Sequence, residues 1–337
     1  MRRLVSSLFA VVVIVAAAII TIGYAELVGL PFALPFGELT SPTLPASPGS
    51  PSQAASSPGT APSAASPSPG PIAVLVGAGD IAMCDRFEDE STAAAVERIP
   101  GTVFTLGDNV YPDGSAKSFK DCYEPSWGRP TIKSRTRPTV GGNEYRVPDA
   151  RDYFAYFGDA AGDPGKGYYA YEEGSWRVYV LNSNCHQIGG CGEGSAQEVW
   201  LRDDLKRHSS RCVLAMWHHP LFSSRPGGGI GLTRALWRAL EDAGAELVLN
   251  GDVHSYERFR PQTADGVADD ERGMVEIVVG TGGAESGSFG PPADNSVRRA
   301  VSVYGVLRLE LARSSYRFEF LSTGGRDFSD SGSRRCS

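Results

Sequence analysis

The chain has 337 residues and a formal net charge of −7, with no long basic segment. This mildly acidic balance disfavours binding to DNA or RNA through many phosphate contacts, although a metal-centred site could still accept a single phosphate. The length suffices for one large domain or two small ones, so the composition along the chain must decide how it is divided.

An apolar segment near the N-terminus follows Arg2 and Arg3 and extends over residues 4–23. Small residues at Gly23 and Ala25 permit cleavage, and about 20 apolar residues are also enough to span a bilayer as a helix. Residues 1–25 are therefore predicted to be a signal peptide or a membrane anchor. Both alternatives place the rest of the protein outside the cytoplasm, secreted or anchored, with this segment as its only contact with the membrane.

Residues 26–71 are dominated by Pro, Ser, Ala and Gly and contain few charges or large apolar side chains. Such a composition buries too little surface to offset the entropy lost on ordering. We expect a disordered linker here, followed by one domain over residues 72–337.

Short β-branched segments alternate with helical patterns along this domain. Three regions near its end (275–279, 301–311 and 316–321) indicate further strands. This order predicts an α/β fold of mixed α+β character. The predicted order before that end is strand 72–76, helix 90–99, strand 102–106, helix 195–208, strand 213–217, helix 232–243 and strand 246–249.

All six cysteines lie in the predicted domain, and an even number fits an oxidising compartment. Six cysteines allow 15 pairings, which the sequence does not distinguish. Cys185 and Cys191 enclose the shortest loop and are the easiest to join. The remaining expectations are Cys84 with Cys122 and Cys212 with Cys336. No pair has the CxxC spacing of a zinc site.

Metal-ligand residue types follow four of the predicted strands. Because sites in open α/β sheets form beyond the carboxyl ends of the strands, these loops should converge. Each alone is typical of a turn or a helix cap, but four together favour a metal site. The strand ends and the residues that follow them are VLVGAG with Asp80, VFTLG with Asp108, VLAMW with His218 and His219, and LVLNG with Asp252 and His254.

Carboxylates and imidazoles suit Zn, Fe or Mn, and a carboxylate between two strand ends can bridge two ions. Two ions roughly 3.5–4 Å apart can supply a hydroxide near neutral pH and stabilise an in-line displacement, which fits hydrolysis of a phosphate ester. Tyr111 follows in GDNVY. Its phenol, with an ordinary pKa of about 10, would bind only a strongly acidic ion such as ferric iron, or else Tyr111 is a packed loop aromatic beside Pro112.

Five blocks together resemble the calcineurin-like metallophosphoesterases: GAGDIA, TLGDNVY, PTVGGNEY, WHHPLF and NGDVHSYER. GDNVY and HSYER resemble the purple-acid-phosphatase branch in particular, and the resemblance covers about residues 72–325. It implies a four-layer α/β/β/α sandwich that hydrolyses phosphomonoesters or phosphodiesters with two metal ions, Fe together with Zn or Mn. The residues that the resemblance would place at the first ion are Asp80, bridging Asp108, Tyr111 and His254. Asp108 and His218 would begin the second ion site, with His219 near the substrate.

Two departures from the family pattern concern the second ion. The family has Gly-Asn-His-Glu or Gly-Asn-His-Asp where this chain has Gly141, Gly142, Asn143 and Glu144. An Asn ligand and a proton-donating His are therefore missing, although a one-residue shift would let Asn143 act as a ligand. Glu144 is expected to be an ordinary loop carboxylate.

The second departure is Asp252, which stands where the family has a histidine ligand. Asp252 can still bind a hard ion such as Mn, but the second site is incomplete compared with the first. Loss of a general acid typically costs about a hundredfold to ten-thousandfold in rate, which an enzyme can survive.

Two further segments are assigned structural roles. Tyr256, Glu257 and Arg258 resemble a segment that follows the last family histidine, and we favour structural contacts for them over shaping of the pocket. The Gly-rich residues 281–287 lack a P-loop lysine, so a nucleotide-binding loop is disfavoured.

The sequence thus predicts a metal-dependent phosphoesterase in which a metal-activated hydroxide attacks the phosphorus of a small phosphate ester. Asp108, His219 and Asn143 are the predicted catalytic residues. The alternative is a degenerate fold that acts as an extracytoplasmic binding module. The natural substrate and the oligomeric state are not set by the sequence.

Overall fold

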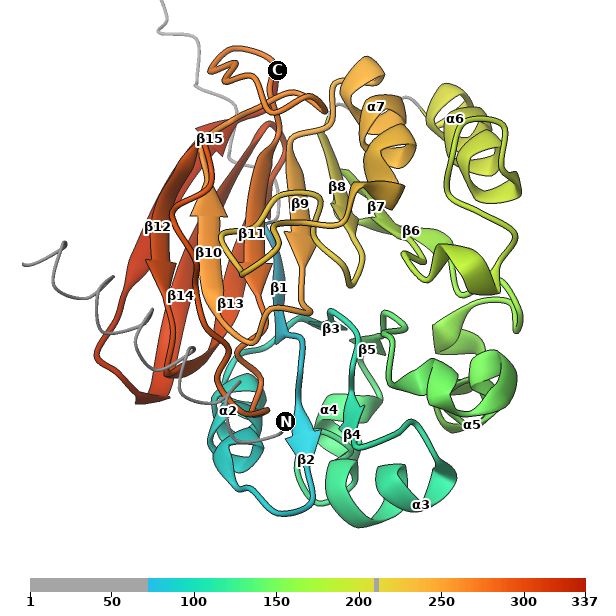
Figure 1. Ribbon diagram of the computed structural model, residues 1–337, viewed down its shortest axis with the longest axis vertical. Coiled ribbons are helices and arrows are strands. Elements are labelled where there is room, and N and C mark those ends of the chain that lie inside the picture. The colour runs from blue at the N-terminus through green and yellow to red at the C-terminus, as the bar shows by residue number, and fades with distance from the viewer. Residues whose placement is uncertain (1–71, 209–211) are drawn as a thin grey trace, which may run out of the picture. The chain divides into compact units, whose positions relative to one another are not determined.

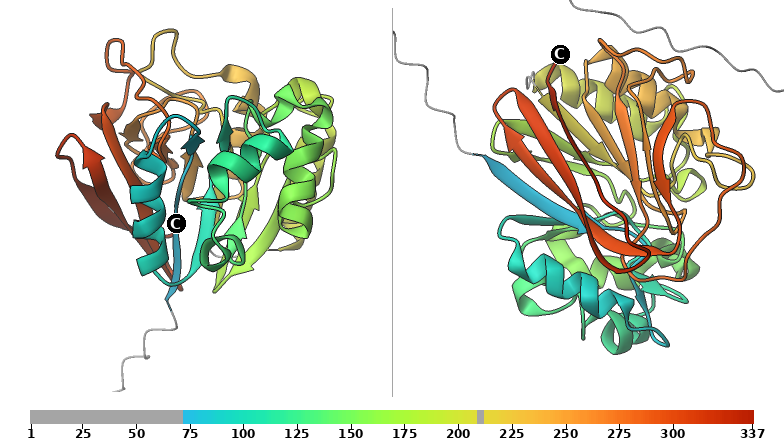
Figure 2. Two further views of the ribbon diagram at one scale, coloured as in Figure 1. Left: turned by 90° about the horizontal axis from the view of Figure 1, so that it is seen from below. Right: turned by 90° about the vertical axis from the view of Figure 1, so that its left-hand side faces the viewer.

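The computed structural model describes residues 72–208 and 212–337, and the predictions for residues 1–25 and 26–71 lie outside them. Two β-sheets lie against each other, with helices beside them (Figures 1 and 2). The first sheet has the strand order β15-β14-β13-β1-β3-β5, and the second has the order β12-β10-β11-β9-β8-β7-β6. Strands β2 and β4 form a separate two-stranded ribbon.

The strands of the first sheet and the ribbon are β1 (Ala73–Ala78), β2 (Ala82–Met83), β3 (Thr102–Thr105), β4 (Val110–Tyr111), β5 (Thr136–Arg137), β13 (Val303–Ala312), β14 (Ser315–Gly325) and β15 (Asp330–Arg335). Those of the second sheet are β6 (Tyr169–Glu173), β7 (Trp176–Val180), β8 (Cys212–Met216), β9 (Leu247–Asn250), β10 (Tyr256–Phe259), β11 (Val275–Val279) and β12 (Ser296–Ala300). The α-helices are α2 (Glu88–Arg98), α3 (Ala116–Ser118), α4 (Pro130–Lys133), α5 (Arg151–Phe157), α6 (Ala196–Arg207) and α7 (Arg234–Asp242).

Both sheets combine parallel and antiparallel pairing. Strands β1, β3 and β5 are parallel in the first sheet, and β7, β8, β9 and β11 are parallel in the second. The outer strands add antiparallel pairs, such as β13 with β14 and β10 with β12. The carboxyl ends of the parallel strands lie at one edge of each sheet, where the loops that carry the predicted ligands begin.

The main core lies between the two sheets. Alternate residues of β8 and β9, such as Leu214 and Leu249, point into this core together with Leu75 and Leu307 of the first sheet. The intervening residues, such as Val213 and Val248, form a second core with α6 and α7. This alternation follows from the two-residue period of a strand.

Helix α2 covers the outer face of the first sheet, where it contacts β13 and β14. The four layers are therefore helix, sheet, sheet and helix, and the predicted mixed α/β sandwich is confirmed.

Local signals explain where the longer helices begin and end. The side chain of Ser195 accepts a hydrogen bond from the backbone N–H of Glu198 and so caps α6. Helix α7 buries Leu236, Trp237 and Leu240 on one face, and Gly244 follows it with a φ of +71° that favours glycine. Strand β15 was not predicted from the sequence, because it lies at the edge of a sheet and contains no large apolar residue.

Three disulfide bonds join all six cysteines, which lie within the described residues. They pair Cys84 with Cys122, Cys185 with Cys191, and Cys212 with Cys336, so the three expected pairs are confirmed. Disulfides of this number are typical of proteins in oxidising compartments. Between residues 72 and 337, leaving out 209–211, none of the helices combines the length and the apolar composition needed to cross a membrane.

The Cys212–Cys336 bond closes the longest loop, because its cysteines are 124 residues apart. Replacing both with serine should lower the free energy of unfolding by up to about 5 kcal/mol, whereas the Cys185–Cys191 pair should contribute only about 2 kcal/mol in the same chain-entropy estimate. Urea unfolding of the two double variants measures this difference. A larger loss from the Cys185–Cys191 variant would contradict the estimate.

Candidate metal centre

The predicted site residues come together beyond the carboxyl ends of four strands, β1, β3, β8 and β9. Figure 1 shows β1, β3 and β9 converging near the centre of the view. Asp80 follows β1, Asp108 follows β3, His218 follows β8, and Asp252 follows β9. The convergence predicted from the sequence is therefore present in the structure.

One group of donors surrounds the hydroxyl of Tyr111. This oxygen lies 2.9 Å from Asp80 Oδ1, 3.1 Å from Asp108 Oδ2 and 2.9 Å from His254 Nε2. His254 Nε2 is also 3.3 Å from Asp80 Oδ1. These four residues are the ones that the sequence pattern assigns to the first metal ion.

A second group lies on the other side of Asp108. His218 Nε2 is 3.4 Å from Asp108 Oδ1 and 3.9 Å from Asp252 Oδ1. Ligand atoms of His218, His219 and Asp252 all lie within 4.8 Å of one another. Asp108 therefore directs one oxygen toward each group, as a bridging carboxylate would.

Backbone carbonyls fix the orientation of His218 and His254. Nδ1 of His218 lies 2.7 Å from the carbonyl oxygen of Leu106, and Nδ1 of His254 lies 2.7 Å from that of Glu285. This arrangement leaves both Nε2 atoms directed at carboxylates, and it is the usual way in which proteins orient metal-binding imidazoles.

The backbone is left-handed at four of the site residues. The φ angles are +57° at Asp80, +47° at Asp108, +70° at Asp252 and +50° at His254. Such angles are uncommon for residues other than glycine, and they concentrate at functional sites where surrounding contacts maintain them. The sharp turns aim these side chains back across the strand ends.

Asn143 and Glu144 hold the Asp108 loop in place. The backbone N–H of Asn143 donates to Asp108 Oδ1 at 2.8 Å, and its side-chain amide donates to Oδ2 at 2.5 Å. The fully buried carboxylate of Glu144 accepts hydrogen bonds from the backbone N–H groups of Asp108, Asn109 and Gly141. Glu144 is thus a buried anchor of the loop, and the expectation of an ordinary loop carboxylate was wrong.

Space at this loop is limited as well. A Cβ atom at Gly141 would lie 2.1 Å from the backbone nitrogen of Asp108 and 2.3 Å from its Oδ1. Glycine is therefore required at position 141 for Asp108 to keep its orientation.

The carboxylates create a negative potential at the centre. Burial would lower the pKa of His218, but Asp108 and its neighbouring carboxylates raise it well above the ordinary value. Burial likewise opposes the charged form of His254, yet Asp80 raises the pKa of that imidazole to about 9. Burial and the charges of Asp80 and Asp108 raise the pKa of the Tyr111 phenol. A bound cation would compensate the negative charge and so lower the pKa values of these three groups.

The donor set fits a metal ion. The phenol oxygen lies within hydrogen-bonding distance of two buried carboxylates. Two oriented imidazole nitrogens lie beside these oxygens. Oxygen and nitrogen donors without thiolates suit Fe, Zn or Mn.

His219 lies beside this cluster of donors and faces a pocket. Its Nδ1 is 2.8 Å from the hydroxyl oxygen of Ser183, which also accepts its backbone N–H at 3.0 Å. Burial, followed by the charge of His218, lowers the pKa of His219 to about 4, so this imidazole is neutral at neutral pH. The pocket measures about 260 Å³ and is lined by Ser183, Asn184, Cys185, His186, Gln187, His219, Ile230 and Leu232.

Asp252 has a partner that the sequence did not indicate. Nη1 of Arg225 forms an ion pair with Asp252 Oδ2, and Nε of Arg225 donates to the carbonyl oxygen of Gly228 at 2.9 Å. The backbone N–H of Asp252 donates to Asp80 Oδ2 at 2.8 Å. Arg225 comes from the loop after β8, where no periodic pattern or motif marks it.

The segment that follows the site contributes structural contacts. Tyr256 and Arg258 both donate to the carboxylate of Asp330, and Glu257 accepts the backbone N–H of Ser224. The structural interpretation of this segment therefore agrees with the contacts. The Gly-rich residues 281–287 support the Asp80 loop, because the Gly282 N–H donates to the carbonyl oxygen of Gly79.

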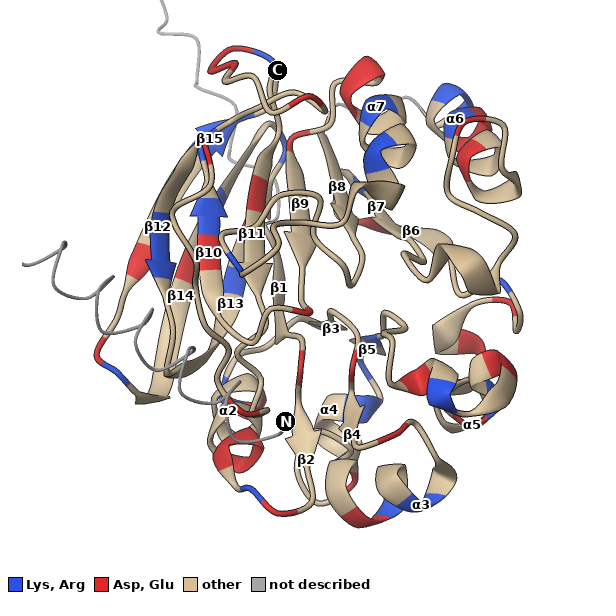
Figure 3. Cartoon of the chain, viewed as in Figure 1, with Lys and Arg blue, Asp and Glu red and all other residues tan. Residues whose placement is uncertain are grey.

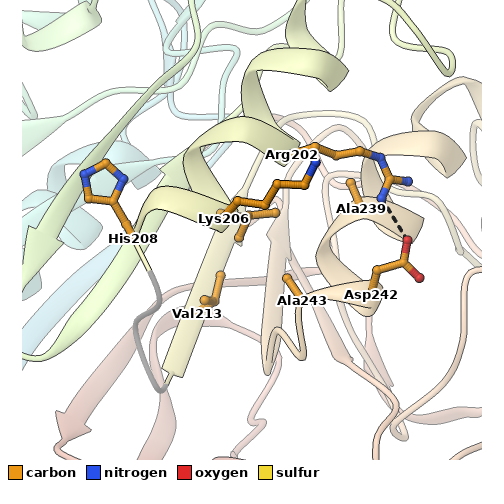
Figure 4. Close-up of a pocket in the computed structure, with 8 residues that line it drawn as sticks. Arg202, Lys206, His208, Val213, Ala239, Asp242 and Ala243 are labelled. Carbon is orange, nitrogen blue, oxygen red and sulfur yellow. Dashed lines mark hydrogen bonds and ion pairs between the residues drawn. The ribbon is translucent and has the colours of Figure 1, made fainter.

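Another pocket lies between α6 and α7 (Figure 4). Its lining includes Arg202 and Asp242, which form an ion pair, and Val213 at the start of β8. The site residue His218 follows the opposite end of that strand. This second pocket contains none of the predicted site residues.

The surface charges are mixed. In the view of Figure 3, both Lys and Arg and Asp and Glu are distributed over the helices and strands.

The sequence matches no protein-family model and no curated protein sequence. The structure, however, is similar to the purple acid phosphatase PPD1 from seeds of yellow lupin (Lupinus luteus), with a TM-score of 0.62 and 19% identity over 80% of this chain. The alignment spans about half of the lupin protein, 55% of its length.

Two other solved structures show the same likeness. GAP50, the anchor in the inner membrane complex of Plasmodium, has a TM-score of 0.61 and 16% identity over 79% of this chain and 89% of its own. PhoD has a TM-score of 0.52 and 12% identity over 80% of this chain and 71% of its own. The chain therefore has the calcineurin-like metallophosphoesterase fold, as the sequence motifs predicted.

Replacing Glu144 with glutamine should weaken the Asp108 loop, because an amide group cannot accept all three backbone N–H groups. We expect a loss of about 1–3 kcal/mol in the free energy of unfolding and a metal affinity that falls by about 10- to 100-fold. Thermal unfolding and metal titration measure the two effects. The exposed Glu193 provides a matched control, and equal effects of Glu144→Gln and Glu193→Gln would contradict the anchoring role.

Proposed function

We propose that this chain is a metal-dependent phosphoesterase that hydrolyses small phosphate mono- or diesters. The observation that carries the proposal is the position of Asp108 between two groups of donors, with Asp80, Tyr111 and His254 on one side and His218 on the other. The fold shared with a purple acid phosphatase supports the same reaction class.

In this proposal Asp80, Asp108, Tyr111 and His254 hold the first ion, with iron as the preferred metal because of the phenol. His218 and Asp252 face a second position on the other side of Asp108. A bound ion supplies Lewis acidity that activates water and stabilises negative charge in the transition state.

Asn143 contributes by fixing both oxygens of Asp108 through its two N–H donors. Its amide oxygen as a direct metal ligand stays a prediction from the sequence.

His219 is proposed to contact the phosphoryl group. The Ser183 hydroxyl oxygen accepts the backbone N–H of His219. The hydroxyl proton of Ser183 can therefore be donated to Nδ1 of the His219 ring. This assignment leaves the ring proton on Nε2, which is 3.9 Å from the position of a Cβ atom built on Gly142. A neutral imidazole with a proton at Nε2 can donate a hydrogen bond to a phosphate oxygen or a leaving group.

We also propose an extracytoplasmic location. The three disulfides support it, because such bonds persist in oxidising compartments. Secretion and anchoring through residues 1–25 remain the two alternatives drawn from the sequence.

A binding module without catalysis is the second candidate function. The ion pair between Arg225 and Asp252 and the absence of the family's Asn-His pair at Gly142 and Asn143 favour it. The likeness to GAP50, which is described as the anchor in the inner membrane complex of Plasmodium, agrees with such a role.

Hydrolysis of an aryl phosphate by the metal-loaded protein distinguishes the two candidates. Asp108→Asn should reduce the rate by about 10²- to 10⁴-fold, because the ion contributes several kcal/mol to transition-state stabilisation. Asp203→Asn, on the exposed face of α6, should leave the rate unchanged. Unchanged turnover in Asp108→Asn would refute the assignment, and a metal-loaded wild-type protein without turnover would favour the binding module.

Ferric iron bound by Tyr111 should produce a visible charge-transfer absorption from phenolate to metal. Tyr111→Phe should abolish this band, because the ring remains while the donor oxygen is lost. Tyr168→Phe serves as a control for a tyrosine outside the centre. Absorption spectra of the iron-loaded proteins measure the effect, and a band that persists in Tyr111→Phe would exclude the phenol as a ligand.

A further inference from the structure

We propose that the guanidinium group of Arg225 replaces the second metal ion, so that the centre binds one ion per chain. This inference rests on the proposed function, because it requires a metal ion in the first position. It specifies which positive charges face the phosphoryl group: one metal ion and one arginine.

The contacts of Arg225 fix its guanidinium group beside the second position, against Asp252. Nη1 pairs with Asp252 Oδ2, while Nε donates to the carbonyl oxygen of Gly228 at 2.9 Å. The other carboxylate oxygen of Asp252 lies 3.9 Å from His218 Nε2. Arg225, Asp252, His218 and Asp108 thus form a continuous series that ends at the bridging carboxylate.

Both members of the ion pair are largely sheltered from water. The Arg225 side chain is 27% exposed and that of Asp252 is 18% exposed. Screening by solvent is therefore weaker than for a surface pair, and the guanidinium neutralises much of the carboxylate charge. A divalent cation beside His218 would lie next to a group of the same sign.

One ligand place at the second position is unfilled. At Gly142 a Cβ atom would lie 3.9 Å from Asp108 Oδ1, His219 Nε2 and Asn184 Oδ1, so the space for a side chain exists but no ligand fills it. His219 directs Nδ1 to Ser183. Because Asp252 is paired with Arg225, the donors left at this position are Asp108, His218 and the Nε2 atom of His219, and removing Arg225 would add Asp252 to them.

A guanidinium group at this place has its own chemical consequence. It presents several N–H donors in one plane and can bind two oxygens of a phosphoryl group at once. As a part of the chain it is not removed by chelators. The centre would therefore keep one positive charge for substrate binding even when the metal ion is removed.

Metal stoichiometry tests the proposal. The purified full-length protein is loaded with Mn²⁺, freed of excess ion and analysed for metal per chain, and the electron paramagnetic resonance spectrum separates isolated ions from exchange-coupled pairs. The wild type should hold one isolated ion. Arg225→Met should gain a second, coupled ion, because His218, His219 and unpaired Asp252 then face one position. Arg225→Gln, a milder change, should do the same, and Arg225→Lys should keep one ion.

Arg202→Met is the matched control. It also removes an arginine that pairs with an aspartate, Asp242, but this pair lies between α6 and α7 (Figure 4). The number of metal ions per chain in Arg202→Met should equal that of the wild type.

Each outcome bears on the proposal. A coupled pair of ions in the wild type would overturn the inference and leave the phosphoesterase proposal intact. One ion in the wild type and still one in folded Arg225→Met and Arg225→Gln would overturn the role of Arg225. A wild type that binds no ion would overturn both proposals.

Discussion

The central constraint on this structure is the mutual repulsion of carboxylates that the fold brings together at its centre. Asp80, Asp108 and Asp252 belong to three different loops, and burial removes most of the water that would otherwise screen their charges. The surrounding structure compensates in two ways. First, imidazoles and a guanidinium group face the carboxylates. Second, the negative charge that these groups leave uncompensated can attract a bound cation.

The fold stabilises this unfavourable arrangement through the backbone. Left-handed turns at Asp80, Asp108, Asp252 and His254 cost conformational energy, and neighbouring loops offset that cost with hydrogen bonds. Glu144 binds three backbone N–H groups around Asp108, and the Gly-rich segment binds the loop that carries Asp80. The large buried core between the sheets provides a rigid base for these loops.

The sequence predicted most of the fold and most of the polar residues that meet at the strand ends, because both depend on local patterns. Strand β11 was predicted with its observed bounds, and Asp80, Asp108 and His218 were found as polar residues directly after apolar strands. Arg225, Ser183 and the anchoring role of Glu144 could not be found in this way. They act through contacts between loops that are distant in sequence, and neither residue type nor spacing identifies such contacts.

The second sheet shows the same limit. Strands β10 and β12 are short and contain charged residues, and they are defined by hydrogen bonds to each other and to β11. Their apolar content gives no clear signal of a strand. Prediction therefore fails where tertiary pairing, instead of intrinsic propensity, determines the local structure.

The pairing of β1 with β13 has a consequence for how the molecule is made. Ala73 lies opposite Leu311, so the first described strand obtains one of its two neighbours only from residues synthesised much later. Contacts of such wide sequence separation slow folding and leave apolar strands exposed in the meantime. During biosynthesis the loop after β1 stays without its full sheet until β13 (Val303–Ala312) has emerged.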